Sequence, residues 1–257
     1  MNFKQANEDY IKKDFKRITI VLGHYGSGKS EFSINYALKL SKIIRNVSLI
    51  DIDVASPYFR SRERADFLKK NGVTSIFSSF GVDNNLDMPA LTPIMFAPIQ
   101  DPRQNVVIDC GGDSSGAKIL EQLKRYLPKK DQMDILCVIN ANRPETSTIE
   151  GALQQISSIE NEIDMNIGSI VNNTHMLRET KLEDIIFGNE ICKKICKTKE
   201  IRLKFTCIEE SLLENLFNYN DENSIDSHLN ESEQRFIRSL ENIFPINLML
   251  RENWLDL

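Results

Sequence analysis

Short runs of β-branched and other apolar residues alternate with stretches of helical hydrophobic spacing along most of the chain. Such runs are typical of strands buried in a parallel sheet, and apolar residues at i, i+3 and i+4 are typical of helices packed on it. The pattern predicts strands at Ile18–Leu22, Val47–Asp53, Thr74–Ser78, Asn105–Asp109, Met133–Ile139, Asn166–Asn172 and Arg202–Cys207. It predicts helices that begin near Ser30 and at Arg62–Lys70, Ala117–Leu127, Thr148–Ile163 and Lys181–Lys197. This alternation favours an α/β fold with a mainly parallel sheet and helices on both faces, arranged in three layers.

Two segments interrupt the alternation. Phe80–Pro102 contains four prolines among apolar residues, which predicts a loop with one short helix at Pro89–Phe96. Asn218–Glu233 is polar and acidic and is expected to be an exposed loop, followed by a helix near Gln234–Ile243.

The two ends of the chain are less regular than its centre. We interpret residues 1–17 as a polar lead-in and residues 208–257 as a C-terminal extension, and leave open whether the tail Ile246–Trp254 pairs with the sheet. No linker or internal repeat divides the sequence, so a single domain over 1–257 is expected.

Composition narrows the class of protein. The 257 residues are 41% hydrophobic and 27% charged, as in soluble globular proteins. The net charge of −5 disfavours nonspecific binding to nucleic acids or anionic membranes. No apolar run approaches the roughly 20 residues that a membrane span needs, and no secretory signal precedes the first strand. Five scattered cysteines indicate a reducing environment, so a cytoplasmic location is expected.

A glycine-rich octapeptide joins the first predicted strand to the first predicted helix. It fits the pattern G-x-x-x-x-G-K-[ST], the P-loop that wraps the phosphates of a nucleotide. Its lysine would reach the β- and γ-phosphates, and the serine hydroxyl would bind Mg²⁺. The helix N-terminus adds N–H groups and the positive end of a dipole. The residues expected to bind ATP or ADP here are Gly23, His24, Tyr25, Gly26, Ser27, Gly28, Lys29, Ser30 and the adjacent Glu31.

A second strand end carries a carboxylate followed by glycines. The run Asn105–Asp109 places Asp109 at the carboxyl edge of the sheet, where P-loop proteins hold Mg²⁺, often through water. Gly111 and Gly112 would let the backbone pass close to a γ-phosphate, so either amide is a candidate γ-phosphate contact.

Two acids end another predicted strand. Asp51 and Asp53 are two residues apart, so their carboxylates can share a face of the strand. One could orient an attacking water or bind the hydration shell of the metal, while the other fixes the next loop. Ser30, Asp53 and Asp109 form the predicted Mg²⁺ set, and Lys29, Asp51, Asp53 and Asp109 are candidates for catalysis.

The loop after Asp53 carries two arginines. Arg60 and Arg62 could bind a phosphate or act as an arginine finger supplied within the chain. Equally, both could be ordinary charges at the start of the next helix.

Together, the P-loop, the strand-end Asp51-x-Asp53 and the strand ending in Asp109-x-Gly-Gly resemble the MinD/ParA-like ATPases of the signal-recognition/MinD class of P-loop proteins. The loop is most similar to that of clostridial-type ATP-binding proteins grouped with them. The turn Asn142–Ser147 is similar to the Asn-Pro-Glu-x-Ser turn of that family, and its adenine-binding asparagine would correspond to Asn172 or Asn173.

One position departs from that family. The residue after the first loop glycine is a second signature lysine in MinD/ParA proteins, and it is His24 here. We expect a slow Mg²⁺-dependent ATPase that acts as a nucleotide-dependent switch with a protein partner or as a homodimer. The alternatives are a small-molecule kinase or ATP-dependent ligase with a second substrate, and a nucleotide-binding scaffold without turnover.

Overall fold

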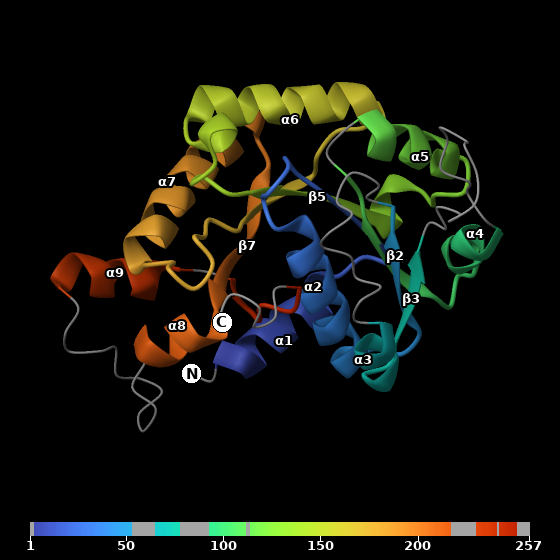
Figure 1. Ribbon diagram of the computed structural model, residues 1–257, viewed down its shortest axis with the longest axis horizontal. Helices are drawn as coiled ribbons and strands as arrows, with labels where there is room; N and C mark the ends of the chain where they lie inside the picture. Colours follow the sequence, from blue (N-terminus) through green and yellow to red (C-terminus); the bar gives the residue numbers. More distant parts are fainter. Residues whose placement is uncertain are drawn as a thin grey trace, which may run out of the picture.

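The computed structural model describes residues 3–52, 65–77, 93–111, 114–216, 230–240 and 242–250. In these residues eight strands form one sheet in the order β3-β2-β4-β1-β5-β6-β7-β8, and every neighbouring pair is parallel (Figure 1). The strands are β1 (Ile18–Leu22), β2 (Val47–Asp51), β3 (Val73–Phe77), β4 (Asn105–Asp109), β5 (Met133–Ile139), β6 (Ser169–Asn172), β7 (Arg202–Glu209) and β8 (Ile243–Ile246).

Helices cover both faces of this sheet. The described helices are α1 (Phe3–Asp14), α2 (Lys29–Ile43), α3 (Ala65–Lys70), α4 (Pro93–Gln100), α5 (Ser114–Lys124), α6 (Ile149–Ile163), α7 (Leu182–Lys199), α8 (Glu210–Leu216) and α9 (Glu231–Ser239). Short 3₁₀ turns occupy Lys130–Gln132 and Pro144–Thr146.

The core consists of two layers, one on each side of the sheet. Alternate residues of β1 enter opposite layers: Ile20 packs with α4–α7, and Val21 packs with α1–α3. Because side chains alternate along a strand, a continuous apolar run supplies both layers at once. The predicted three-layer α/β fold is therefore confirmed.

Several element boundaries differ from the prediction. The strand expected from Asn166 begins at Ser169, because the Ile167 amide donates to the Glu160 side chain instead of a neighbouring strand (2.9 Å). The short helix expected at Pro89–Phe96 runs instead over Pro93–Gln100, and its expected first residues lie outside the described part of the chain.

Residues predicted as a polar lead-in include a helix in the structure. They form α1, whose Ile11 is 1% exposed, and Tyr10 packs edge-on against Phe205 of β7. Only one face of this helix is apolar, so its overall composition is polar although the helix docks on the sheet.

The helix and strand near the C-terminus also differ from the prediction in their bounds. The helix expected to reach Ile243 ends at Ser239, and Ile243 begins strand β8. The helix stops because Leu240 is extended (φ −71°, ψ 114°). Asn242, just before β8, is left-handed (φ 57°), and β8 contains Pro245, a residue that an edge strand tolerates. Within the predicted C-terminal extension, Ile208 and Glu209 end β7, and β8 adds a strand beside it.

Candidate functional site

The loop Gly23–Ser30 connects β1 to α2 at the carboxyl edge of the sheet. Three of its glycines have positive φ: 152° at Gly23, 73° at Gly26 and 83° at Gly28. A Cβ atom on Gly28 would lie 2.3 Å from Asn173 Nδ2, and one on Gly23 would lie 2.4 Å from the Val138 carbonyl oxygen. Both the backbone conformation and the close neighbours therefore require glycine at these positions.

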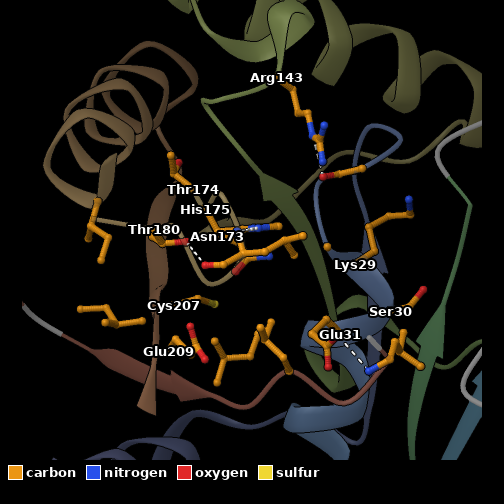
Figure 2. Close-up of a pocket in the computed structure, with 18 of the residues that line it drawn as sticks. Lys29, Ser30, Glu31, Arg143, Asn173, Thr174, His175, Thr180, Cys207 and Glu209 are labelled. Carbon is orange, nitrogen blue, oxygen red and sulfur yellow. Dashed lines mark hydrogen bonds between the residues drawn. The ribbon is translucent and has the colours of Figure 1, made fainter. Parts of the chain in front are cut away.

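The loop ends in the N-terminus of α2. The first α-helical hydrogen bond runs from the Phe32 amide to the Gly28 carbonyl (2.9 Å), so the amides of Lys29, Ser30 and Glu31 lie at the helix N-terminus. Such an end attracts anions through its N–H groups and dipole. Lys29 is only 5% exposed, and Figure 2 shows it and Ser30 on the side of the loop away from Asn173.

Two buried carboxylates lie side by side near this helix. Asp51 of β2 and Asp109 of β4 are direct partners in the parallel register, and they are 6% and 1% exposed. Asp51 and Asp109 share a strand face with Leu49 and Val107, which pack on the α2 side of the sheet. The Ser33 hydroxyl of α2 donates to Asp109 Oδ1 (3.3 Å). Ser33 lies one turn after Ser30, so Asp109 is placed beneath the predicted metal-binding serine. Adjacent buried carboxylates suit a bound cation.

Several residues predicted to belong to the nucleotide site fall outside the part of the chain that the structure describes. Asp53, Arg60, Arg62 and Gly112 lie outside the described residues, whereas Gly111 is buried directly after β4. Their predicted roles stay predictions.

A pocket of about 240 Å³ lies beside the P-loop, and Lys29 and Ser30 are among the residues that line it (Figure 2). Its polar wall comes from the loop itself, from the β5–α6 turn and from the β6–α7 turn. Its apolar wall comes from the ends of β7 and β8 and from α7. Among the lining residues are Gly28, Glu31, Arg143, Asn173, Thr174, His175, Leu177, Ile185, Cys207, Ile208, Glu209, Ile246, Leu248 and Leu250.

The β6–α7 turn is tied to the P-loop by one of the two predicted asparagines. Asn173 Nδ2 donates to the Ser27 carbonyl (2.8 Å), and Asn173 lines the pocket. Asn172 is directed into the turn instead, where its Oδ1 accepts from the Thr174 amide (3.2 Å) and hydroxyl (2.7 Å). Of the two candidates, Asn173 is therefore the one that lines the pocket.

The β5–α6 turn supports the P-loop from the other side. Arg143 Nε donates to the Gly26 carbonyl (3.1 Å), and the Glu145 carboxylate lies 3.4 Å from His24 Nε2. The sequence marked this turn only through its Asn-Arg-Pro-Glu pattern, which did not reveal that Arg143 lines the pocket. Glu209 was missed as well, because nothing near it in the sequence forms a recognisable motif.

The described cysteines are all buried, including the pair Cys192 and Cys196 on α7. Both face the core, and burial raises the pKa of the Cys196 thiol to about 11. Thiols in this state are mainly protonated at neutral pH, as expected for core residues.

The parallel sheet, the glycine-rich strand–loop–helix connection and the strand-end carboxylates together define the P-loop NTPase fold. Comparisons with solved structures agree with this class. No protein-family model matches the sequence, and no curated protein matches it either.

Among the similar structures is cell division protein FtsY from Thermotoga maritima, with 21% identity and a TM-score of 0.50 over 80% of this chain and 68% of that chain. Chloroplast FtsY from Physcomitrella patens has 12% identity and a TM-score of 0.50, over 79% of this chain and 65% of that chain. A nucleotide-binding protein from Archaeoglobus fulgidus in complex with ADP has 14% identity and a TM-score of 0.46, over 82% and 89% of the two chains.

The likeness to the two FtsY structures, each with a TM-score of 0.50, supports the P-loop NTPase fold. The two neighbours with a TM-score of 0.50 are FtsY proteins, a different branch from MinD/ParA, so membership of the MinD/ParA-like family is not confirmed. Among the described helices, none combines the length and the apolar character needed to cross a bilayer.

Proposed function

We propose that this protein binds ATP with Mg²⁺ and acts as a nucleotide-dependent switch that hydrolyses ATP slowly. The main support is the Asn173–Ser27 hydrogen bond. It joins the phosphate loop to the adjacent pocket, which could hold the base of a nucleotide whose phosphates lie in the loop. In this arrangement the triphosphate lies on the Lys29 side of the loop and the purine lies on the Asn173 side.

The phosphate side has the groups that this role needs. The N-terminus of α2 and the buried Lys29 supply positive charge, while Ser30 and Asp109 are oxygen donors of the kind that Mg²⁺ prefers. Arg60 and Arg62 remain our candidates for stabilising charge on the transferred phosphoryl group. With His24 in place of a second lysine, low basal turnover is expected.

Replacement of Asp109 with asparagine is expected to weaken the Mg²⁺ dependence of ATP binding more than binding without metal. The reason is that the carboxylate would act on the metal through its charge, while the amide keeps a similar shape. Calorimetric titration of ATP with Mg²⁺ and with EDTA measures both affinities. Ser33→Ala serves as a control for loss of the Asp109 hydrogen bond alone. Equal losses with and without metal would make Asp109 a structural residue.

The choice of base is proposed from the turn after β6. Guanine sites commonly place an Asp about three residues after an Asn, where it accepts from the guanine N1–H and amino group. The sequence after Asn172 reads Asn-Thr-His, and Asn173 is followed by Thr-His-Met, so neither asparagine has that acid. The amide oxygen of Asn173 can accept from the amino group of adenine.

ATP is therefore expected to bind more tightly than GTP in a competition titration with a fluorescent ATP analogue. The carboxylate of Glu209 lines the pocket and could accept hydrogen bonds from either adenine or guanine. A variant of this residue is therefore the necessary control. Glu209→Gln should affect ATP modestly, since adenine offers it one donor group. Tighter GTP binding by the wild type, lost selectively in Glu209→Gln, would overturn the ATP assignment and make Glu209 a guanine reader.

A further inference from the structure

The segment after β8 returns to the P-loop helix and is fastened there by side chains of α2. Asn35 Nδ2 donates to the Asn247 carbonyl and its Oδ1 accepts from the Asn247 amide, both at 2.9 Å. Glu31 accepts from the amides of Met249 and Leu250, the latter at 3.2 Å. More than 200 residues separate these partners in the chain, so the contacts are tertiary.

This fastening turns alternate side chains toward the pocket. Leu248 and Leu250 line it together with Ile246 of β8, and Ile246 and Leu250 also belong to the core between the sheet and α2. Met249 packs on that core and does not line the pocket. Asn35 is 3% exposed and uses both atoms of its amide group on the segment, so the segment is held in a defined position. The pocket thus has a polar wall beside Asn173 and an apolar wall contributed by the end of the sheet.

Glu31 links this wall to the phosphate side. Its backbone belongs to the N-terminal turn of α2, where anions bind, while its carboxylate is held by the two segment amides. A carboxylate released near a triphosphate would repel it, and N–H donors stabilise the charged carboxylate where it stands. Docking of the segment therefore holds the Glu31 carboxylate in place through two backbone amides.

We propose that Ile246–Leu250 is a built-in clamp for the purine ring, held by Glu31 and Asn35, and that it restricts the site to phosphates that carry a base. The inference rests on the proposed nucleotide site. Leu248 contacts the ring face in this arrangement, and Glu31 couples the clamp to the occupancy of the P-loop.

The test compares ATP with inorganic tripolyphosphate, which has the phosphates but no ring. Leu248→Ser is expected to weaken ATP binding about tenfold, as for loss of one well-buried apolar contact, and to leave tripolyphosphate binding unchanged. Met249→Ser is the matched control, since the neighbouring side chain faces the core and not the pocket. It should keep the wild-type ATP affinity even where it lowers stability.

Hydrogen exchange gives a second, independent readout of the clamp. ATP should slow exchange at the amides of Asn247, Met249 and Leu250 in the wild type, and Glu31→Ala should reduce this protection. Glu31→Gln, which keeps one acceptor oxygen, should restore part of it.

The outcomes separate the two proposals. A wild type that binds neither ATP nor tripolyphosphate would refute the nucleotide site, and the clamp with it. A wild type that binds ATP normally, with Leu248→Ser equally tight and no added amide protection, would refute the clamp alone. Equal losses of ATP and tripolyphosphate affinity in Leu248→Ser would also refute it, because the leucine would then not act on the ring.

Discussion

Replacement of Lys29 with alanine is expected to abolish tight ATP binding while leaving the fold intact. Lys29 is 5% exposed and stands at the end of the phosphate loop, so its ammonium group would meet the phosphates away from bulk water. Removing one partner of a buried charge pair costs about 2–5 kcal/mol of binding free energy, which is roughly a 30- to 5,000-fold loss of affinity. Isothermal calorimetry with Mg²⁺-ATP measures the loss.

The matched control is Lys39→Ala on the same helix. Lys39 Nζ lies 5.1 Å from the centre of the Phe244 ring, on a later turn of α2, and it does not line the pocket. This variant should keep the wild-type affinity, and circular dichroism should show both variants folded. If Lys29→Ala bound ATP as tightly as Lys39→Ala, the P-loop assignment would be wrong.

The parts of the site that sequence predicts well are local. The P-loop, its preceding strand and its following helix occupy Ile18–Ile43 without a break, so one motif fixes all three. Asp109 was also predictable, since a buried strand that ends in a carboxylate must place it at the carboxyl edge of a parallel sheet. The register that sets Asp51 beside Asp109 follows from the pairing of β2 with β4, and neither strand's sequence alone predicts that pairing.

The parts that sequence missed depend on distant pairings. Arg143 contacts Gly26 across 117 positions, through a turn whose residues suit many loops. Glu209 and Leu248 reach the pocket because β8 pairs with β7 at the edge of the sheet. Phe236, Ile237, Leu240 and Ile243 recur at helical spacing, so the pattern extended α9 across the point where Asn242 turns the chain into β8.

Replacement of Lys204 with methionine is expected to destabilise the protein by about 3–5 kcal/mol, because it leaves buried carboxylates without their cation. Lys204 is 1% exposed and lies near the amino end of β7, whereas the pocket lies at the carboxyl end of that strand. Its ammonium group contacts Asp134 of β5 and lies 3.0 Å from Asp14 Oδ2 of α1. Arg202 also pairs with Asp14 (2.7 Å) but is 3.8 Å from Asp134, so it replaces Lys204 only in part. Urea denaturation followed by circular dichroism measures the free energy of unfolding.

Lys124→Met provides the surface comparison for this ion pair. Lys124 forms an ion pair with Asp164 at 3.1 Å, but the aspartate is 94% exposed, so the loss of unfolding free energy should stay at about 0–1 kcal/mol.

Acid titration of Asp14 adds a second check. Burial acts to raise the pKa of Asp14, but hydrogen bonds from Arg202 and Lys204 outweigh it and hold the pKa below 3.8. The ionised carboxylate therefore stabilises the fold above pH 3.8, and this contribution is lost as the pH falls below that value. Lys204→Met should show a smaller acid loss than the wild type, because the pKa of Asp14 then moves back toward 3.8. Similar losses of stability for Lys204→Met and Lys124→Met would mean that the buried cluster does not fasten α1 to the sheet.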